Sequence, residues 1–181
     1  MLVRRKRRER YEHAGFCLYT TAVAAARAPY LYRTLGVPDT LDGRFDLVCL
    51  YVSLLIRRLQ ADSAPGPALA QAVFDAMFSD MDRTLRELGV GDLSVGRRVR
   101  AMWEALHGRA LAYQAALAAR DFMALKGALA RNVWRGAVPA EGAAEALAKL
   151  TFAQAEFLAG QALSDLATGK VAFLPATEAA Q

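Results

Sequence analysis

The sequence predicts an all-α protein, a single domain built as a bundle of about six helices around one central hydrophobic helix. Apolar residues recur at helical spacing through nearly all of the 181 residues, whereas the β-branched, turn-bounded runs that indicate strands are missing. Hydrophobic residues make up 55% of the chain and charged residues 23%, which is enough apolar material for a packed core. A chain of this length needs no second core.

The first helix is expected from about Arg8 to Arg27. Pro29 ends it, because a proline disfavours helical geometry at the residue before it. The same proline suits the first position of a new helical turn, which we expect to reach Leu35. Gly36 fits the end of that turn.

The segment from Asp42 to Gln60 is predicted to be the most buried helix. At about 100° per residue, apolar side chains surround it almost completely and leave only a narrow polar stripe that includes Asp46. Thr40 or Asp39 is the expected N-cap, since a short polar side chain accepts a hydrogen bond from a free N–H group of the first turn. This helix belongs at the centre of the bundle.

Three further helices follow a loop rich in Pro and Gly at residues 61–68. Gly89 fits the end of the first of them. Ser94 and Asp121 are the expected N-caps of the second and the third. The three helices are expected over residues 68–88, 95–119 and 122–134.

A last helix is expected over about residues 140–168, and it carries two apolar faces, one of which includes Leu147 and the other Phe152. Such a helix either packs on two sides or offers one face to a partner. The residues after it have few apolar anchors and are not expected to be firmly structured. The chain is therefore divided into a basic N-terminal arm at 1–10, a helical domain at 11–168 and a tail at 169–181.

The net charge of +5 is confined to the arm, where six basic side chains stand against one acid, while the rest of the chain is electrically balanced. A block of this kind can hold an anionic membrane surface at roughly 1 kcal/mol per basic residue, or it can hold RNA. A solvated helix start without a partner is the third interpretation. The six side chains are those of Arg4, Arg5, Lys6, Arg7, Arg8 and Arg10.

Neither a signal peptide nor a membrane span is expected. The basic run and the apolar stretch at 14–28 imitate a signal peptide, but Glu12 and His13 interrupt their junction. The most apolar run elsewhere, residues 47–56, falls well short of the about 20 residues that cross a bilayer. We therefore expect a cytoplasmic protein.

The sequence contains no recognisable catalytic or metal-binding pattern. Its two histidines, His13 and His107, are far apart and belong to no known ligand spacing. Cys17 and Cys49 lie in apolar helical patterns without a second ligand nearby, so neither a zinc site nor a disulfide framework is indicated. We predict a protein that is not an enzyme and that uses no cofactor.

Two stretches are more specific than helix formation requires. The first reads ARAPYLY at 26–32 and GVPDTLDGRFD at 36–46, and the second reads FDAMFSDMD at 74–82 and LRELGVGDLSVG at 85–96. Together they resemble the signature of the ubiquinol-cytochrome c chaperone family, and the resemblance covers about residues 15–135.

This resemblance implies a chaperone that assembles respiratory complex III (ubiquinol-cytochrome c reductase) by binding newly made cytochrome b. It implies a peripheral membrane protein on the inner face of the bacterial inner membrane, or in the mitochondrial matrix in eukaryotic relatives. Mitochondrial relatives also act with a small helical partner and near the ribosome. No DNA partner is expected. The alternative is a ribosome or nucleic-acid binding module that acts through the basic arm.

Two kinds of residues are expected to contact a client. Arg44, Asp46 and Asp75 have no opposite charge at helical spacing, so they either bridge helices or face a polar client segment. Flexible Met and Phe side chains can repack against an irregular partner, although the same side chains also suit a core. The apolar candidates are Phe74, Met77, Phe78 and Met81, and on the last helix Phe152, Leu163 and Leu166.

Overall fold

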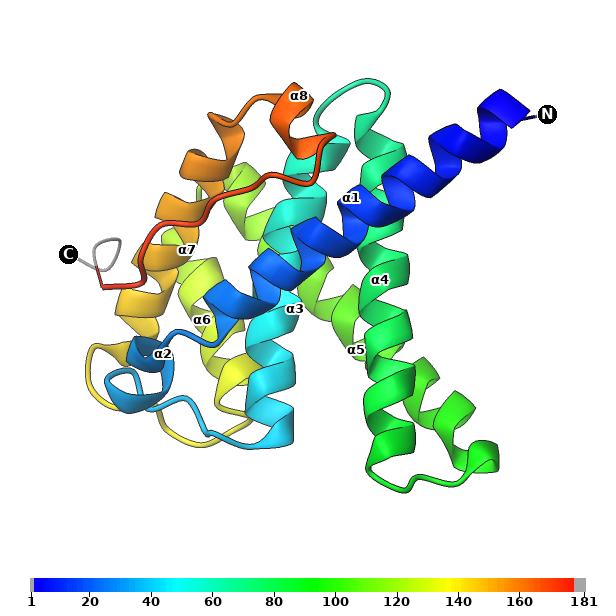
Figure 1. The fold of residues 1–181 in the computed structure, drawn as a ribbon. Helices are drawn as coiled ribbons and strands as arrows, with labels where there is room; N and C mark the ends of the chain where they lie inside the picture. Colours follow the sequence, from blue (N-terminus) through cyan, green and yellow to red (C-terminus); the bar gives the residue numbers. More distant parts are fainter. Residues whose placement is uncertain (1, 178–181) are drawn as a thin grey trace.

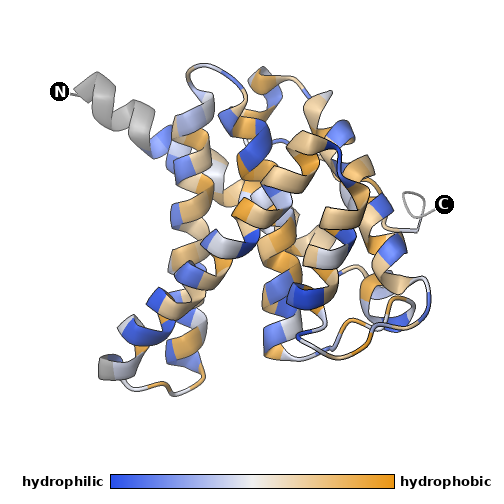
Figure 2. Cartoon of the chain, turned by 180° about the vertical axis from the view of Figure 1, so that it is seen from behind, coloured by the Kyte–Doolittle hydropathy of each residue, from blue (hydrophilic) through white to orange (hydrophobic). Residues whose placement is uncertain are grey.

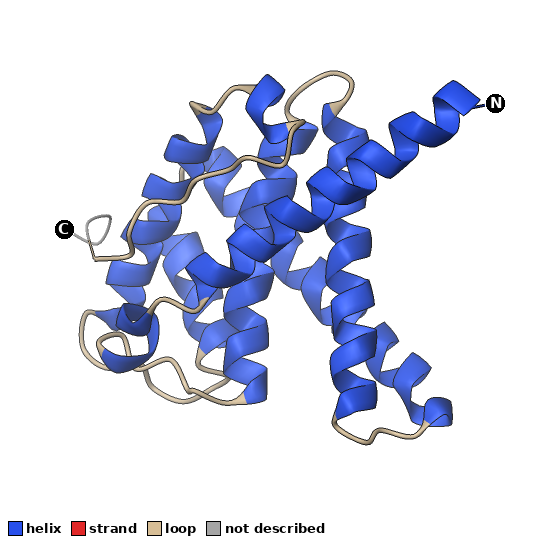
Figure 3. Ribbon diagram, in the orientation of Figure 1, coloured by secondary structure: helices blue, strands red, loops and turns tan. Residues whose placement is uncertain are grey.

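The computed structural model describes residues 2–177, with the side chains of residues 2–8 and of Leu93 outside that description. Every regular element within that range is a helix, so the all-α prediction is confirmed (Figures 1 and 3). The six long helices form the bundle, and α2 and α8 are short. The helices are α1 (Leu2–Ala26), α2 (Pro29–Arg33), α3 (Leu41–Gln60), α4 (Gly66–Glu87), α5 (Asp92–Ala119), α6 (Phe122–Val133), α7 (Ala143–Ala159) and α8 (Leu163–Leu166).

Helix α3 is the centre of the molecule, as its apolar circumference predicts. It packs against α1, α4, α5, α6 and α7, and more than half of its 20 residues are buried. Thr40 caps it, since the Thr40 hydroxyl accepts a hydrogen bond from the backbone N–H of Gly43 at 3.1 Å. Hydrophobic residues fill the middle of the bundle (Figure 2).

Most helix ends lie within a few residues of their predicted places. Helix α2 begins at Pro29, and Asp121 caps α6 by accepting from the N–H of Ala124 at 2.9 Å. The prediction of Ser94 as an N-cap is wrong, because α5 already begins at Asp92 and its N-cap is Gly91. The earlier start places an acidic side chain in the first turn, where the helix dipole favours it.

Helix α1 begins at Leu2, so the backbone of the basic arm continues the helix that was expected to begin near Arg8. Its N-terminal end projects beyond α4 (Figure 1). The side chains of Arg4, Arg5, Lys6, Arg7 and Arg8 lie outside the described residues. Arg10 is exposed.

The last helix is shorter than predicted. Helix α7 ends at Ala159, with Gly160 as its C-cap, and α8 follows after a bend. The chain then returns along α7 as a tail, in which Phe173 packs edge-on against Tyr51 with ring centroids 5.3 Å apart. The two-faced helix therefore packs on two sides, and the tail that was expected to be loose is one of the segments it packs against.

Helix α4 and the first half of α5 form a hairpin that diverges from α3 towards its turn (Figure 1). The turn uses Gly89 at a φ of 77°, a value that glycine adopts without strain. Within residues 2–177, no helix combines the length and the hydropathy needed to cross a bilayer.

Candidate functional site

A partly open cleft lies where the α4–α5 hairpin diverges from α3. It has a volume of about 250 Å³ and is bounded by α1, α3, α4 and α5. We call it the methionine cleft. Its apolar lining includes Val23, Phe45, Val48, Met77, Met81 and Met102, with Leu41 at its mouth, and its polar residues include Tyr19, Arg27, Arg44 and Asp80.

The apolar lining combines a buried floor with partly exposed walls. Met77 is fully buried and Met81 is 7% exposed, whereas Phe45, Val48 and Met102 are only partly buried. Methionine has three rotatable bonds and a polarisable sulfur, so it adapts to irregular shapes. The cleft is therefore suited to apolar side chains that differ in shape.

The polar residues of the cleft are held by two pairs. The phenol of Tyr19 on α1 donates to the carboxylate of Asp80 on α4 at 2.7 Å. Burial raises the pKa of Tyr19, and the Asp80 hydrogen bond raises it further, so the phenol stays protonated as a donor. Arg44 pairs with Asp39 at 2.6 Å near the solvent, and this hydrogen bond lowers the pKa of Asp39.

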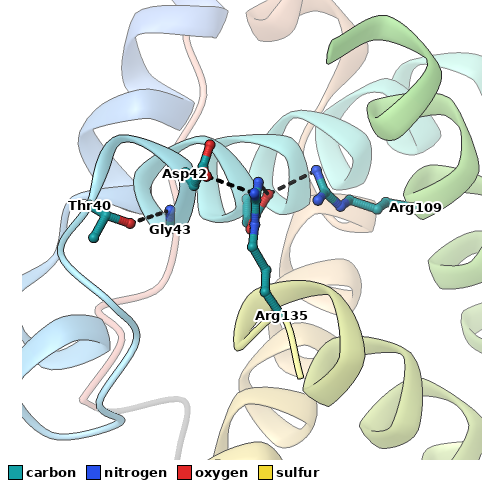
Figure 4. A network of polar contacts seen from close by, with 6 residues as sticks. Thr40, Asp42, Gly43, Arg109 and Arg135 are labelled. Atoms are coloured by element: carbon teal, nitrogen blue, oxygen red, sulfur yellow. Dashed lines mark hydrogen bonds and ion pairs between the residues drawn. The ribbon is translucent and has the colours of Figure 1, made fainter. Parts of the chain in front are cut away.

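Asp46 bridges helices, which is one of the two roles expected for it. Figure 4 shows its two partners, Arg109 and Arg135, pointing towards α3 from α5 and from the end of α6. Its carboxylate is fully buried and accepts from Arg135 at 2.6 and 3.0 Å. Arg109 on α5 forms an ion pair with it at 2.8 Å, and Arg135 also pairs with Asp42 at 2.8 Å. Burial raises the pKa of Asp46, while the two guanidinium groups oppose that rise. The buried position makes direct contact between Asp46 and a client impossible in this conformation.

The Asp46 network also supports the methionine cleft. The guanidinium of Arg109 lies over the ring of Phe45, 5.7 Å from its centroid, and Phe45 lines the cleft. A cation over an aromatic face is attracted by the ring electrons. The network therefore links α3, α5 and the end of α6 to one wall of the cleft.

The structure separates the residues that were expected to contact a client. Three of them, Arg44, Met77 and Met81, line the methionine cleft. Met77 is fully buried and forms part of the floor of the cleft. Phe74 lies on the other side of α4, in a hollow of about 210 Å³ between α3, α4 and α5, with its ring 4.5 Å from that of Phe78.

The remaining expected residues have local partners. The carboxylate of Asp75 accepts from Gln71, one turn earlier on α4, at 2.8 Å. Phe152 stacks on Phe122 of α6 at 6.2 Å. Leu163 is partly buried, and Leu166 is fully buried and so is not part of the surface.

Five important residues were missed because their partners are distant in sequence. Tyr19 and Asp80 are 61 positions apart, and Asp46 and Arg135 are 89 positions apart. Helical spacing gives no signal at such distances. Only Phe45 and Asp80 had a sequence signal, since Phe45 lies in the GRFD part of the first family stretch and Asp80 lies in the FDAMFSDMD part of the second. The missed residues are Tyr19, Phe45, Asp80, Arg109 and Arg135.

Among the described residues, no cluster of three or more His, Cys, Asp or Glu side chains is arranged to hold a metal ion. Cys49 is buried beside Asp46 and Arg109, and burial raises the pKa of its thiol. The thiol is therefore protonated and shielded.

A family profile, a related protein and a solved structure all indicate the same family for this chain. The profile of the family described as Ubiquinol-cytochrome C chaperone matches residues 33–173, so the match begins later than the expected residue 15 and includes α7 and part of the tail. A Xenopus laevis protein described as Ubiquinol-cytochrome-c reductase complex assembly factor 1 is 23% identical over 166 residues, 91% of this chain and 82% of that protein.

A crystal structure of the Cbp3 homolog from Brucella abortus superposes with a TM-score of 0.85 at 32% identity, and the superposition covers 98% of this chain and 99% of that one. The likeness thus extends over nearly the whole helical bundle. The chain belongs to the ubiquinol-cytochrome c chaperone family, a family of non-catalytic assembly factors for respiratory complex III.

Proposed function

We propose that this protein binds newly made cytochrome b at the membrane surface and holds it, without turnover, until complex III is assembled. Family membership supports a role in the assembly of complex III. The methionine cleft is the observation that supports the proposed way of binding the client. Cytochrome b is a multispanning apolar protein, so its chaperone needs an adaptable apolar surface. In the cleft, the partly buried Met102 supplies one beside Phe45 and Val48.

The size of the cleft supports a contact with single side chains of a client. At about 250 Å³ it is smaller than the roughly 300–1,000 Å³ of typical ligand pockets. One or two side chains of a longer client segment suit it better than a cofactor does. Leu41, at the mouth of the cleft, is 55% exposed and would be among the first side chains that such a segment meets.

The basic arm supplies the proposed attachment to the membrane. Its helix projects from the bundle (Figure 1), and Arg10 on it is exposed. Anionic lipid attracts clustered basic residues without any requirement for a membrane span. We place the protein on the inner face of the inner membrane in a bacterium, where new cytochrome b emerges.

Photo-crosslinking from native membranes tests the client site. A photoreactive residue at Leu41 is expected to capture cytochrome b, whereas the same residue at Met123, which is 69% exposed on α6, is expected to capture little. Equal capture at both positions would contradict a cleft-directed contact. Capture at Phe152 or Leu163 instead would move the client surface to the region of α7 and leave the function standing.

The same membranes test the alternative function. If rRNA without cytochrome b co-purifies with the protein, and its release depends on the arm, the ribosome or nucleic-acid interpretation replaces the chaperone. A small helical partner would be found in the same preparation by mass spectrometry.

A further inference from the structure

The tail is held by its backbone. The carboxamide of Gln154 donates to the carbonyl of Leu174 at 2.7 Å and accepts from its N–H at 2.9 Å. The carboxamide of Gln161 likewise donates to the carbonyl of Ala172 at 2.8 Å and accepts from its N–H at 2.9 Å. Because the earlier glutamine meets the later tail residue, the tail runs antiparallel to α7. We call residues 171–176 the strap.

The strap binds the two glutamines through every second residue, which identifies it as an extended chain. In an extended chain, the N–H and C=O groups of residues i and i+2 point to the same side. Ala172 and Leu174 are two residues apart and both face the glutamines. Each carboxamide therefore offers what a neighbouring β-strand would offer, one donor and one acceptor to a single residue.

The side chains of the strap that face the bundle are apolar. Phe173 packs edge-on against Tyr51 of α3, Val171 is partly buried against the core, and Ala176 is buried, whereas Ala172 and Pro175 are exposed. The backbone bonds carry no sequence information, so selection comes from an apolar residue, an aromatic residue two positions later and a small residue three positions after that. Other extended segments that have these three features could make the same contacts.

Helix α7, which carries Gln154, has packing partners other than the strap, since it also packs against α3 and α6. With the strap in place, Gln154 is 1% exposed. A buried carboxamide needs hydrogen-bond partners, and in the free protein the strap supplies both of them. A segment that replaces the strap must supply the same donor and acceptor.

We propose that Gln154, Gln161 and Tyr51 form a groove for an extended peptide, and that the strap occupies it until an extended apolar segment of an incoming chain, with an aromatic residue in place of Phe173, displaces it. The inference rests on the proposed function only for the identity of the incoming chain. This groove and the methionine cleft are separate sites.

The strap is part of the same chain as the groove, and this covalent link determines how its displacement can be measured. A segment attached by a short linker competes at a millimolar effective concentration, so the strap masks the groove from a free peptide. Weakening the strap should therefore reveal peptide binding. In the full chain, Phe173→Ala removes the aromatic contact of the strap and leaves the groove unchanged.

The probe is a fluorescent peptide of residues 169–177, GKVAFLPAT, and the readout is its anisotropy with the full chain. We expect the Phe173→Ala protein to bind it at least about tenfold more tightly than the wild type does. Adding Gln161→Ala should weaken that binding, and so should Gln154→Ala. A peptide with Ala at the Phe173 position should bind poorly to every variant.

Hydrogen exchange at the Leu174 amide shows whether the strap is loosened in the Phe173→Ala protein, so that a failure of the peptide to bind can be interpreted. If the Leu174 amide exchanges faster in Phe173→Ala and the peptide still binds no better than to the wild type, the proposal fails. Binding that occurs only together with dimerisation, followed by light scattering, would assign the groove to a second copy and also overturn it. The assay contains no cytochrome b, so it can succeed or fail independently of the proposed function.

Discussion

At the scale of the residue, Asp46 illustrates how a single buried charge organises several elements. It is completely enclosed on α3, yet it has partners on α5 and after α6. Removing Asp46 leaves the largely buried Arg109 without its counter-ion, which costs far more than breaking a surface pair. The sequence marked Asp46 as a charge without a local partner, and this was the usable signal. The identity of Arg135 could not be predicted, because it lies 89 positions away.

Replacing Asp46 tests how much this network stabilises the fold. We expect Asp46→Ala to lower the free energy of unfolding by about 3–5 kcal/mol, measured by urea denaturation, because Arg109 loses its buried counter-ion. Arg44→Ala is the control, since it breaks an exposed pair and should leave the urea midpoint nearly unchanged. A loss below about 1 kcal/mol for Asp46→Ala would show that water or relaxation compensates the arginines.

At the scale of the element, helix ends were predictable where a local signal sets them and unpredictable where packing does. Thr40 and Asp121 cap their helices through their own side chains. The end of α7 at Ala159 depends instead on Gly160 and on a Gln161 side chain that bonds to Ala172 of the tail. Such a contact has no periodic signature, which explains the overlong predicted helix.

The crossing of α1 and α4 provides a test at this scale. A Cβ at Gly15 would lie 2.6 Å from the backbone carbon of Ala72, so Gly15→Ala must force the two helices apart. We expect it to destabilise the fold by about 1–3 kcal/mol in thermal unfolding followed by circular dichroism.

Gly108→Ala is the matched control for Gly15→Ala. Gly108 also lies within a helix, but a Cβ added there would meet no other atom within 4 Å beyond its own helix backbone and chain neighbours. Alanine should therefore stabilise the protein there by about 0.5–1 kcal/mol. Equal effects at the two positions would contradict the close contact between α1 and α4.

At the scale of the whole molecule, the arrangement places the methionine cleft between α3 and the α4–α5 hairpin, and the basic arm at the projecting end of α1 (Figure 1). The sequence predicted the fold class, the central helix and the family. It could not predict the cleft, because a cleft depends on the angle at which helices diverge. Helical periodicity therefore identified Met77 and Met81 but not their cleft neighbours Phe45 and Tyr19.

The arm can be tested separately from the cleft. Replacing Arg4, Arg5, Lys6, Arg7 and Arg8 with Gln should release the protein from anionic liposomes in a flotation assay and leave its melting temperature unchanged. Binding of the wild type should weaken as salt rises through about 0.1 M, where the Debye length is about 10 Å. If the substituted protein floats as well as the wild type, the arm is only solvated.

The proposed role of the methionine cleft in complex III assembly can be tested by complementation. In a strain that lacks the gene, assembled complex III and its b-type haem absorbance are compared after expression of the wild type, Leu41→Glu or Met123→Glu. Both substitutions place an acid in the first turn of a helix, where the dipole tolerates it, so both proteins should fold.

We expect the wild type and Met123→Glu to restore the complex, and Leu41→Glu to leave it low while the cytochrome b message is present, because a charge at the mouth of the cleft opposes an apolar client. Full restoration by Leu41→Glu would contradict the role of the cleft. Normal complex III in the strain without the gene would contradict the proposed function itself.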